Sequence, residues 1–333
     1  MEDKIFNWGV IAPGRISHSF AKAMRVVSDA RLFSVASSQL DRAQSFAAEY
    51  GCKYAYDDYQ TLIEDPNVDV VYIANPHRFH FECIKKCLIA GKPVLCEKPI
   101  TVNEAQCQEL IELANKHQVF LMEAVWTRFL PIWQQVQVWI EKQSIGQLQS
   151  MSSSFGFNLP KDESDRLFNN SLAGGALLDM GIYSLTMSQF VMQKEPTSVV
   201  ANGVIGSTYV DEHTSGTLSY EGVQSFFTCS FNKPLDNNFI LSGSKGRIVI
   251  PSMFWAATCG ILDIDGQEPV MVELPFRATG FEYQIEEVIR CLSHGKLQSD
   301  VLSWQDSVAT MRIMDLIREQ IGIKYPFLNM SDH

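Results

Sequence analysis

A short turn near the start of the chain has residues suited to binding a dinucleotide. It reads IAPGRIS, ends at Ser17 and follows an apolar run that we expect to be a strand. The dinucleotide fingerprint places glycines where Ala12, Gly14 and Ser17 stand, and only Gly14 matches it, although alanine and serine are small enough for the outer positions. At Gly14 the absent Cβ would let the backbone N–H groups of Arg15 and Ile16 approach a pyrophosphate at a helix N-terminus. The alternative is an ordinary strand-to-helix turn.

The end of the second predicted strand favours NADP over NAD. A carboxylate there would bind the ribose 2′-hydroxyl of NAD. This strand ends instead with Ser37 and Ser38, and Arg42 follows four residues later. The hydroxyls could donate hydrogen bonds to a 2′-phosphate, and Arg42 could supply the positive charge. The alternative is that Arg42 is a solvated helix residue and that NAD binds as well.

A lysine stands where a parallel sheet would present it to a ligand. Lys98 follows residues 93–96, a short apolar run that we expect to be a buried strand, and Pro99 restricts how the chain leaves it. Open parallel sheets bind ligands at the carboxyl ends of their strands. Lys98 is therefore a candidate catalytic group, although by composition alone a lysine is more often a surface residue. A cis Lys98–Pro99 bond is compatible with this turn.

Asp179 and Tyr183 form the second part of a candidate catalytic set. They are four residues apart, so on a helix they would share one face. Hydride transfer to or from a carbinol carbon needs a group that moves a proton, which contributes about 10²–10⁴-fold. A nearby Lys98 ammonium would lower the pKa of the Tyr183 phenol, and Asp179 could orient Lys98 or bind a substrate hydroxyl. The alternative is a core tyrosine and a helix-surface acid.

The pattern of apolar runs places these residues in two domains. Up to residue 123, short apolar runs alternate with amphipathic segments, which predicts a doubly wound α/β domain with a parallel sheet. After residue 123, longer alternating segments separated by turn signals predict an α+β domain with a largely antiparallel open sheet. Residues 176–191 are its predicted internal helix. Trp126 and Arg128 follow the last strand of the first domain and are candidates for lining the cofactor, with plain packing as the alternative.

Composition excludes several classes of protein. The chain has 333 residues with 46% hydrophobic and 20% charged residues, which excludes intrinsic disorder. A net charge of −11 argues against binding nucleic acid or an anionic membrane surface. The 8 cysteines are scattered, and no apolar run has the length of a transmembrane helix, so we expect a cytoplasmic protein. No spaced set of His, Cys, Asp and Glu predicts a metal site.

The motifs together resemble one known family, the Gfo/Idh/MocA oxidoreductases. Four segments carry the resemblance: the turn at Gly14, Asn75-Pro76-His77 with His80, Glu97-Lys98-Pro99, and the stretch GGALLDMGIY that ends at Tyr183. Residues 122–129 and 179–183 are most similar to the dimeric dihydrodiol dehydrogenase branch. Ala12 and Ser17 depart from the family's glycines, and His77 replaces a more usual small polar residue.

The resemblance implies both a fold and an activity. It implies a Rossmann domain that binds NAD(P), followed by a domain whose open sheet contacts the substrate and forms a dimer interface. It implies catalysis by Lys98 and by the residue at 183, where much of the family has histidine. It also implies cofactor contacts from Asn75, Pro76, His80 and Glu97.

We therefore expect an NADP-preferring oxidoreductase, with NAD possible, that acts on a sugar, polyol, vicinal diol or carbonyl compound. A dinucleotide-sensing regulator without turnover is the alternative from another class. Such a regulator would not need Lys98, Asp179 and Tyr183 together. A sugar oxidoreductase that keeps its cofactor bound is a third possibility. The expected partners are a small-molecule substrate and a second copy of the chain, with no nucleic acid, membrane or metal.

Overall fold

The computed structural model describes residues 4–328 and divides the chain into two compact units. Unit 1 consists of the chain up to Trp126 together with Phe276–Val308, and unit 2 consists of Thr127–Pro275 and the chain from Ala309. The sequence pattern predicts one boundary, after residue 123. The structure differs because the chain returns to unit 1 after Pro275.

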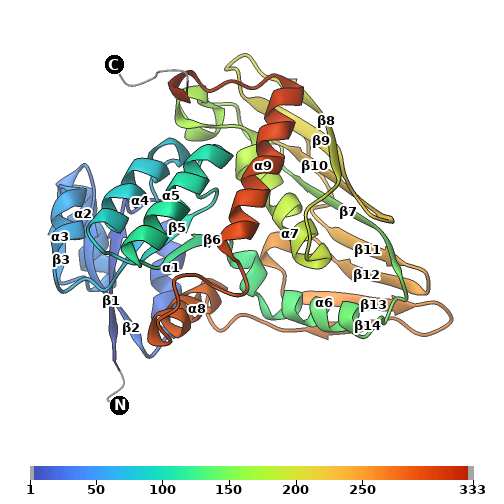
Figure 1. Cartoon of the computed structure of the whole chain (residues 1–333), viewed down its shortest axis with the longest axis horizontal. Helices are drawn as coiled ribbons and strands as arrows, with labels where there is room; N and C mark the ends of the chain where they lie inside the picture. The colour runs from blue at the N-terminus through green and yellow to red at the C-terminus, as the bar shows by residue number, and fades with distance from the viewer. Residues whose placement is uncertain (1–3, 329–333) are drawn as a thin grey trace. The chain divides into compact units, whose positions relative to one another are not determined.

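Unit 1 contains a six-stranded, fully parallel sheet (Figure 1). The strand order is β3-β2-β1-β4-β5-β6, the doubly wound order of a Rossmann fold. Its strands are β1 (Phe6–Ile11), β2 (Ala30–Ala36), β3 (Tyr54–Tyr56), β4 (Val70–Ile73), β5 (Val94–Glu97) and β6 (Leu121–Ala124). Its helices are α1 (Arg15–Met24), α2 (Leu40–Tyr50), α3 (Tyr59–Glu64), α4 (His80–Ile89), α5 (Glu104–His117) and α8 (Glu282–Ser293).

Two inner strands of this sheet are buried along their whole length. Every residue of β4 and β5 is buried, as expected for parallel strands covered on both faces. Phe20 of α1 stacks on Tyr72 of β4 with ring centroids 3.8 Å apart. The Asn103 side chain caps α5 by accepting the Gln106 N–H at 2.8 Å. The N-terminal part of the fold prediction is confirmed.

The segment that returns to unit 1 is tied to its sheet and to α1. The Leu121 N–H of β6 donates to the Leu297 carbonyl at 3.1 Å, and the Thr279 hydroxyl donates to the Ser19 carbonyl at 3.0 Å. The sequence pattern of residues 282–293 predicts a helix, and α8 spans the same residues. Its amphipathic pattern does not encode which sheet it packs against.

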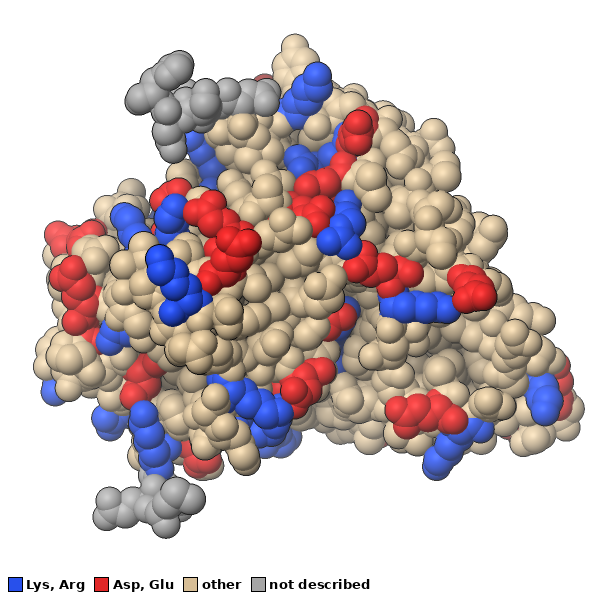
Figure 2. All heavy atoms as spheres, viewed as in Figure 1, with Lys and Arg blue, Asp and Glu red and all other residues tan. Residues whose placement is uncertain are grey.

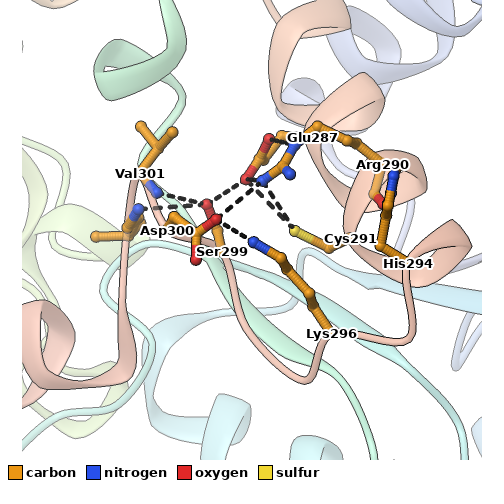
Figure 3. A network of polar contacts seen from close by, with 9 residues as sticks. Glu287, Arg290, Cys291, His294, Lys296, Ser299, Asp300 and Val301 are labelled. Carbon is orange, nitrogen blue, oxygen red and sulfur yellow. Dashed lines mark hydrogen bonds and ion pairs between the residues drawn. The ribbon is translucent and has the colours of Figure 1, made fainter.

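A polar network stabilises this segment internally (Figure 3). Glu287 accepts hydrogen bonds from Arg290 Nε at 2.7 Å and from the Ser299 hydroxyl at 2.5 Å. Burial raises the pKa of Glu287, but the hydrogen bonds from Arg290, Ser299 and Cys291 lower it by more. The pKa of this carboxyl therefore lies below its ordinary value. Burial, with the Glu287 charge, raises the pKa of Cys291 to about 12, so this thiol stays protonated.

Unit 2 contains an eight-stranded mixed sheet with the order β14-β13-β12-β11-β7-β10-β9-β8. All pairs are antiparallel except β7 and β10, so the predicted, largely antiparallel sheet is confirmed. Its strands are β7 (Leu148–Gly156), β8 (Ser198–Ile205), β9 (Asp211–Tyr220), β10 (Val223–Ser230), β11 (Phe239–Gly243), β12 (Gly246–Ile250), β13 (Cys259–Ile264) and β14 (Val270–Glu273). Its helices are α6 (Pro131–Glu141) and α7 (Ile182–Met192), while α9 (Trp304–Ile321) is divided between the units.

The surface carries mixed charge. On the face shown in Figure 2, acidic and basic side chains of the described residues are interspersed, without an extended basic area. Among residues 4–328, no helix is both long and apolar enough to cross a bilayer. In the same range, no group of His, Cys, Asp and Glu side chains is arranged to hold a metal ion.

Candidate functional site

The turn between β1 and α1 fits the pyrophosphate of a dinucleotide. Ala12 has a φ of +61°, in the left-handed region that the first glycine of the fingerprint normally occupies. Gly14 precedes α1, and the first turn of α1 contains no acid. A Cβ added to Gly14 would meet only the Ala12 carbonyl oxygen, at 4.0 Å, so the space beside it is open. The N-terminal N–H groups of α1, beginning at Arg15 and Ile16, can therefore be approached by an anion.

The end of β2 presents two of the three residues predicted to bind a 2′-phosphate. Ser37 is buried, and its hydroxyl accepts the Gln39 N–H at 3.2 Å. Ser38 and Arg42 are exposed. Ser37 thus helps to shape the turn while its O–H can still donate, and Ser38 and Arg42 are the accessible members of the predicted set.

A buried histidine joins the turns that follow β4 and β5. His80 is fully buried; its Nδ1 lies 2.7 Å from the Pro99 carbonyl oxygen and its Nε2 lies 2.8 Å from the Asn75 carbonyl oxygen. Both ring nitrogens therefore contact backbone, so His80 bridges the two turns, and its contact with a cofactor stays a prediction. The Lys98–Pro99 bond is cis.

Two buried acids complete the support of the turn at Lys98. Glu97 accepts the Tyr72 hydroxyl at 2.5 Å. Glu123, which is 2% exposed, accepts the Ile100 N–H at 3.0 Å. Its other oxygen accepts the Ser307 hydroxyl at 2.6 Å. Glu123 thus holds the backbone after Lys98 from β6 and the returning segment, and Tyr72 of β4 holds the Glu97 side chain before it; cofactor contact by Glu97 stays a prediction.

An acceptor without a protein partner lies at the same edge of the sheet. Asn75 Oδ1 is buried and has no hydrogen-bond partner among the described residues, while its Nδ2 donates to the Phe79 carbonyl at 3.4 Å. Pro76 follows it and is half-buried. An orphaned acceptor at the carboxyl edge of the sheet fits a polar group of a bound dinucleotide.

Packing accounts for the positions of Trp126 and Arg128. The Trp126 ring stacks on Phe281 with centroids 4.7 Å apart. Arg128 is 1% exposed, and its guanidinium donates to the Thr186 hydroxyl at 3.0 Å and to the Thr186 carbonyl at 3.1 Å. Cofactor contact by these two residues stays a prediction.

Asp179 and Tyr183 lie where a π-helical turn meets α7. The sequence predicts one α-helix over residues 176–191, but Leu177–Gly181 is π-helical and α7 begins at Ile182. The four-residue spacing therefore does not place the two side chains as it would on an α-helix. Asp179 Oδ1 pairs with Arg166 Nη2 at 3.1 Å, a partner that sequence reasoning missed.

A cluster of aromatic side chains in unit 2 reaches Tyr183 through Phe155. The Phe155 ring centroid lies 5.8 Å from that of Tyr183. Phe155 also stacks on Trp255, with centroids 3.4 Å apart, and contacts Phe157 edge to face. This wall can exclude water from a reacting oxygen beside the phenol. Lys98 belongs to unit 1, and Asp179 and Tyr183 belong to unit 2.

Comparison with known proteins identifies relatives over nearly the full length. The sequence model of the GFO/IDH/MocA family, described as "Oxidoreductase family, NAD-binding Rossmann fold", matches residues 6–125. The model of the GFO/IDH/MocA C-terminal domain matches residues 133–249. The trans-1,2-dihydrobenzene-1,2-diol dehydrogenase of Xenopus laevis is 36% identical, with 96% of this chain and 99% of the relative covered. The human protein of the same name is 33% identical, with 96% and 98% covered.

Solved structures have the same fold. The 3-ketoreductase KijD10 from Actinomadura kijaniata, crystallised with NADP and TDP-benzene, aligns with a TM-score of 0.87 and 25% identity over 96% of this chain and 98% of its own. The aldose–aldose oxidoreductase from Caulobacter crescentus aligns with a TM-score of 0.87 and 22% identity over 95% and 97%.

Proposed function

Because the chain belongs to the Gfo/Idh/MocA oxidoreductase family, we propose that it transfers hydride, preferably with NADP, between nicotinamide C4 and a vicinal diol, sugar or polyol, or the matching carbonyl compound. The family membership predicted from the sequence is confirmed, and it makes the protein an NAD(P)-dependent oxidoreductase acting on CH–OH groups. The substrate class rests on relatives named for a dihydrodiol and for 3-keto reduction.

The observation that carries the proposal is the fixed turn at Lys98. His80 and Glu123 bind the backbone of the two residues that follow Lys98, and the Tyr72 hydroxyl binds Glu97, which precedes it. Lys98 thus follows β5 at the carboxyl edge of the parallel sheet, the same edge at which β1 delivers the chain to α1. Ligands of such sheets bind at this edge.

The residues divide the chemistry between them. When bound, the nicotinamide ring supplies or accepts the hydride. The Tyr183 phenol donates a proton to the substrate oxygen in reduction and accepts it in oxidation. The Lys98 ammonium stabilises negative charge on that oxygen and on the phenolate. Asp179 orients a substrate hydroxyl or Lys98.

Substitution of Lys98 tests this assignment. Lys98→Met should abolish turnover of diols and sugars while NADPH affinity, measured by fluorescence quenching, stays within about tenfold. Lys86→Met, at an exposed site on α4, is the matched control and should keep wild-type kcat. An unchanged kcat in the Lys98 variant would remove its catalytic role.

The preference for NADP is supported by the end of β2. Ser38 and Arg42 are exposed there, and no carboxylate ends the strand to repel a 2′-phosphate. Arg42→Ala should lower kcat/KM for NADPH about tenfold with little effect on NADH, because one charge-assisted phosphate contact contributes roughly 1.5–3 kcal/mol. Lys22→Ala removes the same charge from an exposed site on α1 and should change neither value. A wild-type kcat/KM for NADH equal to that for NADPH would contradict the preference.

We propose that the open face of the unit 2 sheet forms a homodimer. Strand register aligns one row of side chains across all eight strands, and six of its eight members are apolar. The row is Val200, Thr217, Phe226, Ser152, Ile240, Val249, Ile261 and Met271. Val200, Phe226 and Met271 are 61%, 45% and 57% exposed, an apolar band that a second copy would cover.

Sedimentation measures the oligomeric state. Phe226→Arg should convert a dimer to a monomer, whereas Ile89→Arg, at an exposed apolar position of unit 1, should not. A monomeric wild-type protein at micromolar concentration would exclude the dimer.

A cytoplasmic location is the remaining part of the proposal. All eight cysteines are free thiols, and six of them are buried. Such thiols support a reducing compartment.

A further inference from the structure

A fully buried carboxylate lies directly behind the turn that carries Asp179. Asp211 is the first residue of β9 and is 1% exposed. Its Oδ2 accepts the Leu177 N–H at 2.7 Å and the Thr214 hydroxyl at 2.8 Å. Leu177 begins the π-helical turn, so Asp211 binds one of the N–H groups that have no partner inside that turn.

The glycine pair before this turn is shaped around Asp211. Gly175 has a φ of +122°, and a Cβ added to it would lie 2.2 Å from Asp211 Oδ1. The Gly174 carbonyl accepts the Tyr325 hydroxyl at 3.2 Å, and the Gly175 N–H donates to the Leu167 carbonyl at 2.9 Å. The backbone is therefore fixed from β9, from the C-terminal segment and from the loop before it.

The start of the turn determines where the side chains after it lie. The Asp179 N–H donates to the Gly175 carbonyl at 3.2 Å, so the glycine pair and Asp179 are linked through backbone. α7 continues from the turn without interruption and carries Tyr183 as its second residue. A rotation of the backbone at the start of the π-helical turn would therefore change the positions of the Asp179 and Tyr183 side chains.

We infer that Asp211 is a positioning residue, which acts through the Leu177 N–H and Gly175 to hold Asp179 and Tyr183 in the reactive orientation. This inference rests on the proposed function, because it requires that Tyr183 moves the proton. It concerns a residue of unit 2 that contacts neither substrate nor cofactor in our assignment.

The charge of Asp211 changes near neutral pH. Burial raises the pKa of Asp211 to about 7, although the hydrogen bonds from Thr214 and Leu177 oppose the rise. The titratable groups facing it are the Cys229 thiol of β10 and the Tyr325 phenol, whose pKa values burial also raises. Both stay neutral at this pH.

The groups beyond Tyr325 are Arg318 and Asp315 of α9, an ion pair. Asp211 is therefore the group that titrates in this cluster between about pH 6 and 8. A carboxylate accepts an N–H more strongly than a neutral carboxyl does, so the turn is held best above this range.

Asp211→Asn tests the inference, because the amide resembles the neutral carboxyl. Saturating NADPH and substrate isolate kcat from binding. We expect the ratio of wild-type to variant kcat to be near one at about pH 5.5 and to reach about tenfold at about pH 8, since small misplacements of reacting groups cost up to about 10²-fold. NADPH affinity should stay within about twofold. The Leu177 amide should exchange faster with deuterium in the variant at high pH.

Asp263→Asn is the matched control. It makes the same acid-to-amide change on β13 and removes an ion pair with Arg247, yet it should leave kcat unchanged at both pH values. If Asp211→Asn fails to fold, Thr214→Val removes one of the two donors to the same oxygen. In wild type, kcat should rise with pH as Asp211 ionises. In Thr214→Val the midpoint of that rise should move to higher pH, because loss of the donor raises the pKa of Asp211.

The outcomes separate this inference from the proposed function. A kcat ratio that does not vary with pH, or a midpoint that Thr214→Val does not move, would overturn the positioning role of Asp211. If Tyr183→Phe turns over as fast as wild type, the proposed function fails. A slow Tyr183→Phe variant together with full activity of Asp211→Asn at about pH 8 would refute this inference alone.

Discussion

Removal of the Glu123 carboxylate should both destabilise unit 1 and slow catalysis. Glu123 accepts two hydrogen bonds in a site that is 2% exposed, from the Ile100 N–H and the Ser307 hydroxyl. Glu123→Ala leaves both donors buried without a partner, and each costs about 1–3 kcal/mol. We therefore expect a loss of roughly 3–5 kcal/mol in the free energy of unfolding. Glu123→Gln keeps an acceptor for Ile100, so it should lose only about 1–2 kcal/mol.

Urea unfolding followed by tryptophan fluorescence measures the loss, and steady-state kinetics below the unfolding transition measures catalysis. Ile100 is two residues from Lys98, so release of its N–H should lower kcat about tenfold in Glu123→Ala. Glu112→Ala removes an exposed acid from α5. It should change the free energy of unfolding by no more than about 0.5 kcal/mol and leave kcat unchanged. If Glu123→Ala were as stable as this control, or unfolded earlier with unchanged kcat in its folded state, the argument that this carboxylate supports the Lys98 turn would be refuted.

Two further predictions concern unit 2. Gly175→Ala should destabilise it by about 3 kcal/mol or more, because the Cβ would lie 2.2 Å from Asp211 Oδ1 at a φ of +122°. In Gly222→Ala, where φ is +75° and the space is open, the loss in urea unfolding should be only about 1 kcal/mol. The pH dependence of stability should reflect Asp211. Its folded pKa of about 7 exceeds the ordinary value near 3.9, so the folded state loses stability as pH rises between these values, by roughly 4 kcal/mol. Asp211→Asn should remove this fall, and an equally steep fall in the variant would contradict it.

The parallel sheet of unit 1 could be predicted because each of its central strands is a continuous apolar run bounded by turn residues. Residues 69–74 form a β-branched run that predicts a strand and contains β4, and the predicted strand over residues 93–96 overlaps β5. Strands β11, β13 and β14 are not predicted from the sequence. β13 and β14 are short, and most of their side chains are half-buried or exposed, so neither has a long run of buried apolar residues. The return of the chain to unit 1 was missed because a helix pattern does not specify its packing partner.

The candidate site was only partly accessible to sequence reasoning. Lys98 could be proposed as a site residue because the end of a parallel strand has a known place in the fold. The residues that support the site come from distant parts of the chain. Glu123 and Ser307, beside the Lys98 turn, are 184 positions apart, and Asp211 and Leu177, beside the turn that carries Asp179, are 34 apart. A buried acid at a strand end, as at Glu123, is the one sequence signal that could have indicated such support.

The central claim is that Lys98 and Tyr183 act as one unit on the substrate oxygen. Single-turnover hydride transfer in Lys98→Met, Tyr183→Phe and the double variant measures their coupling directly. Our account predicts that the double variant is no more than about threefold slower than the slower single variant, as found for catalytic groups that work together. If the two effects instead multiply, so that their free-energy costs add, the residues act independently and the account is contradicted.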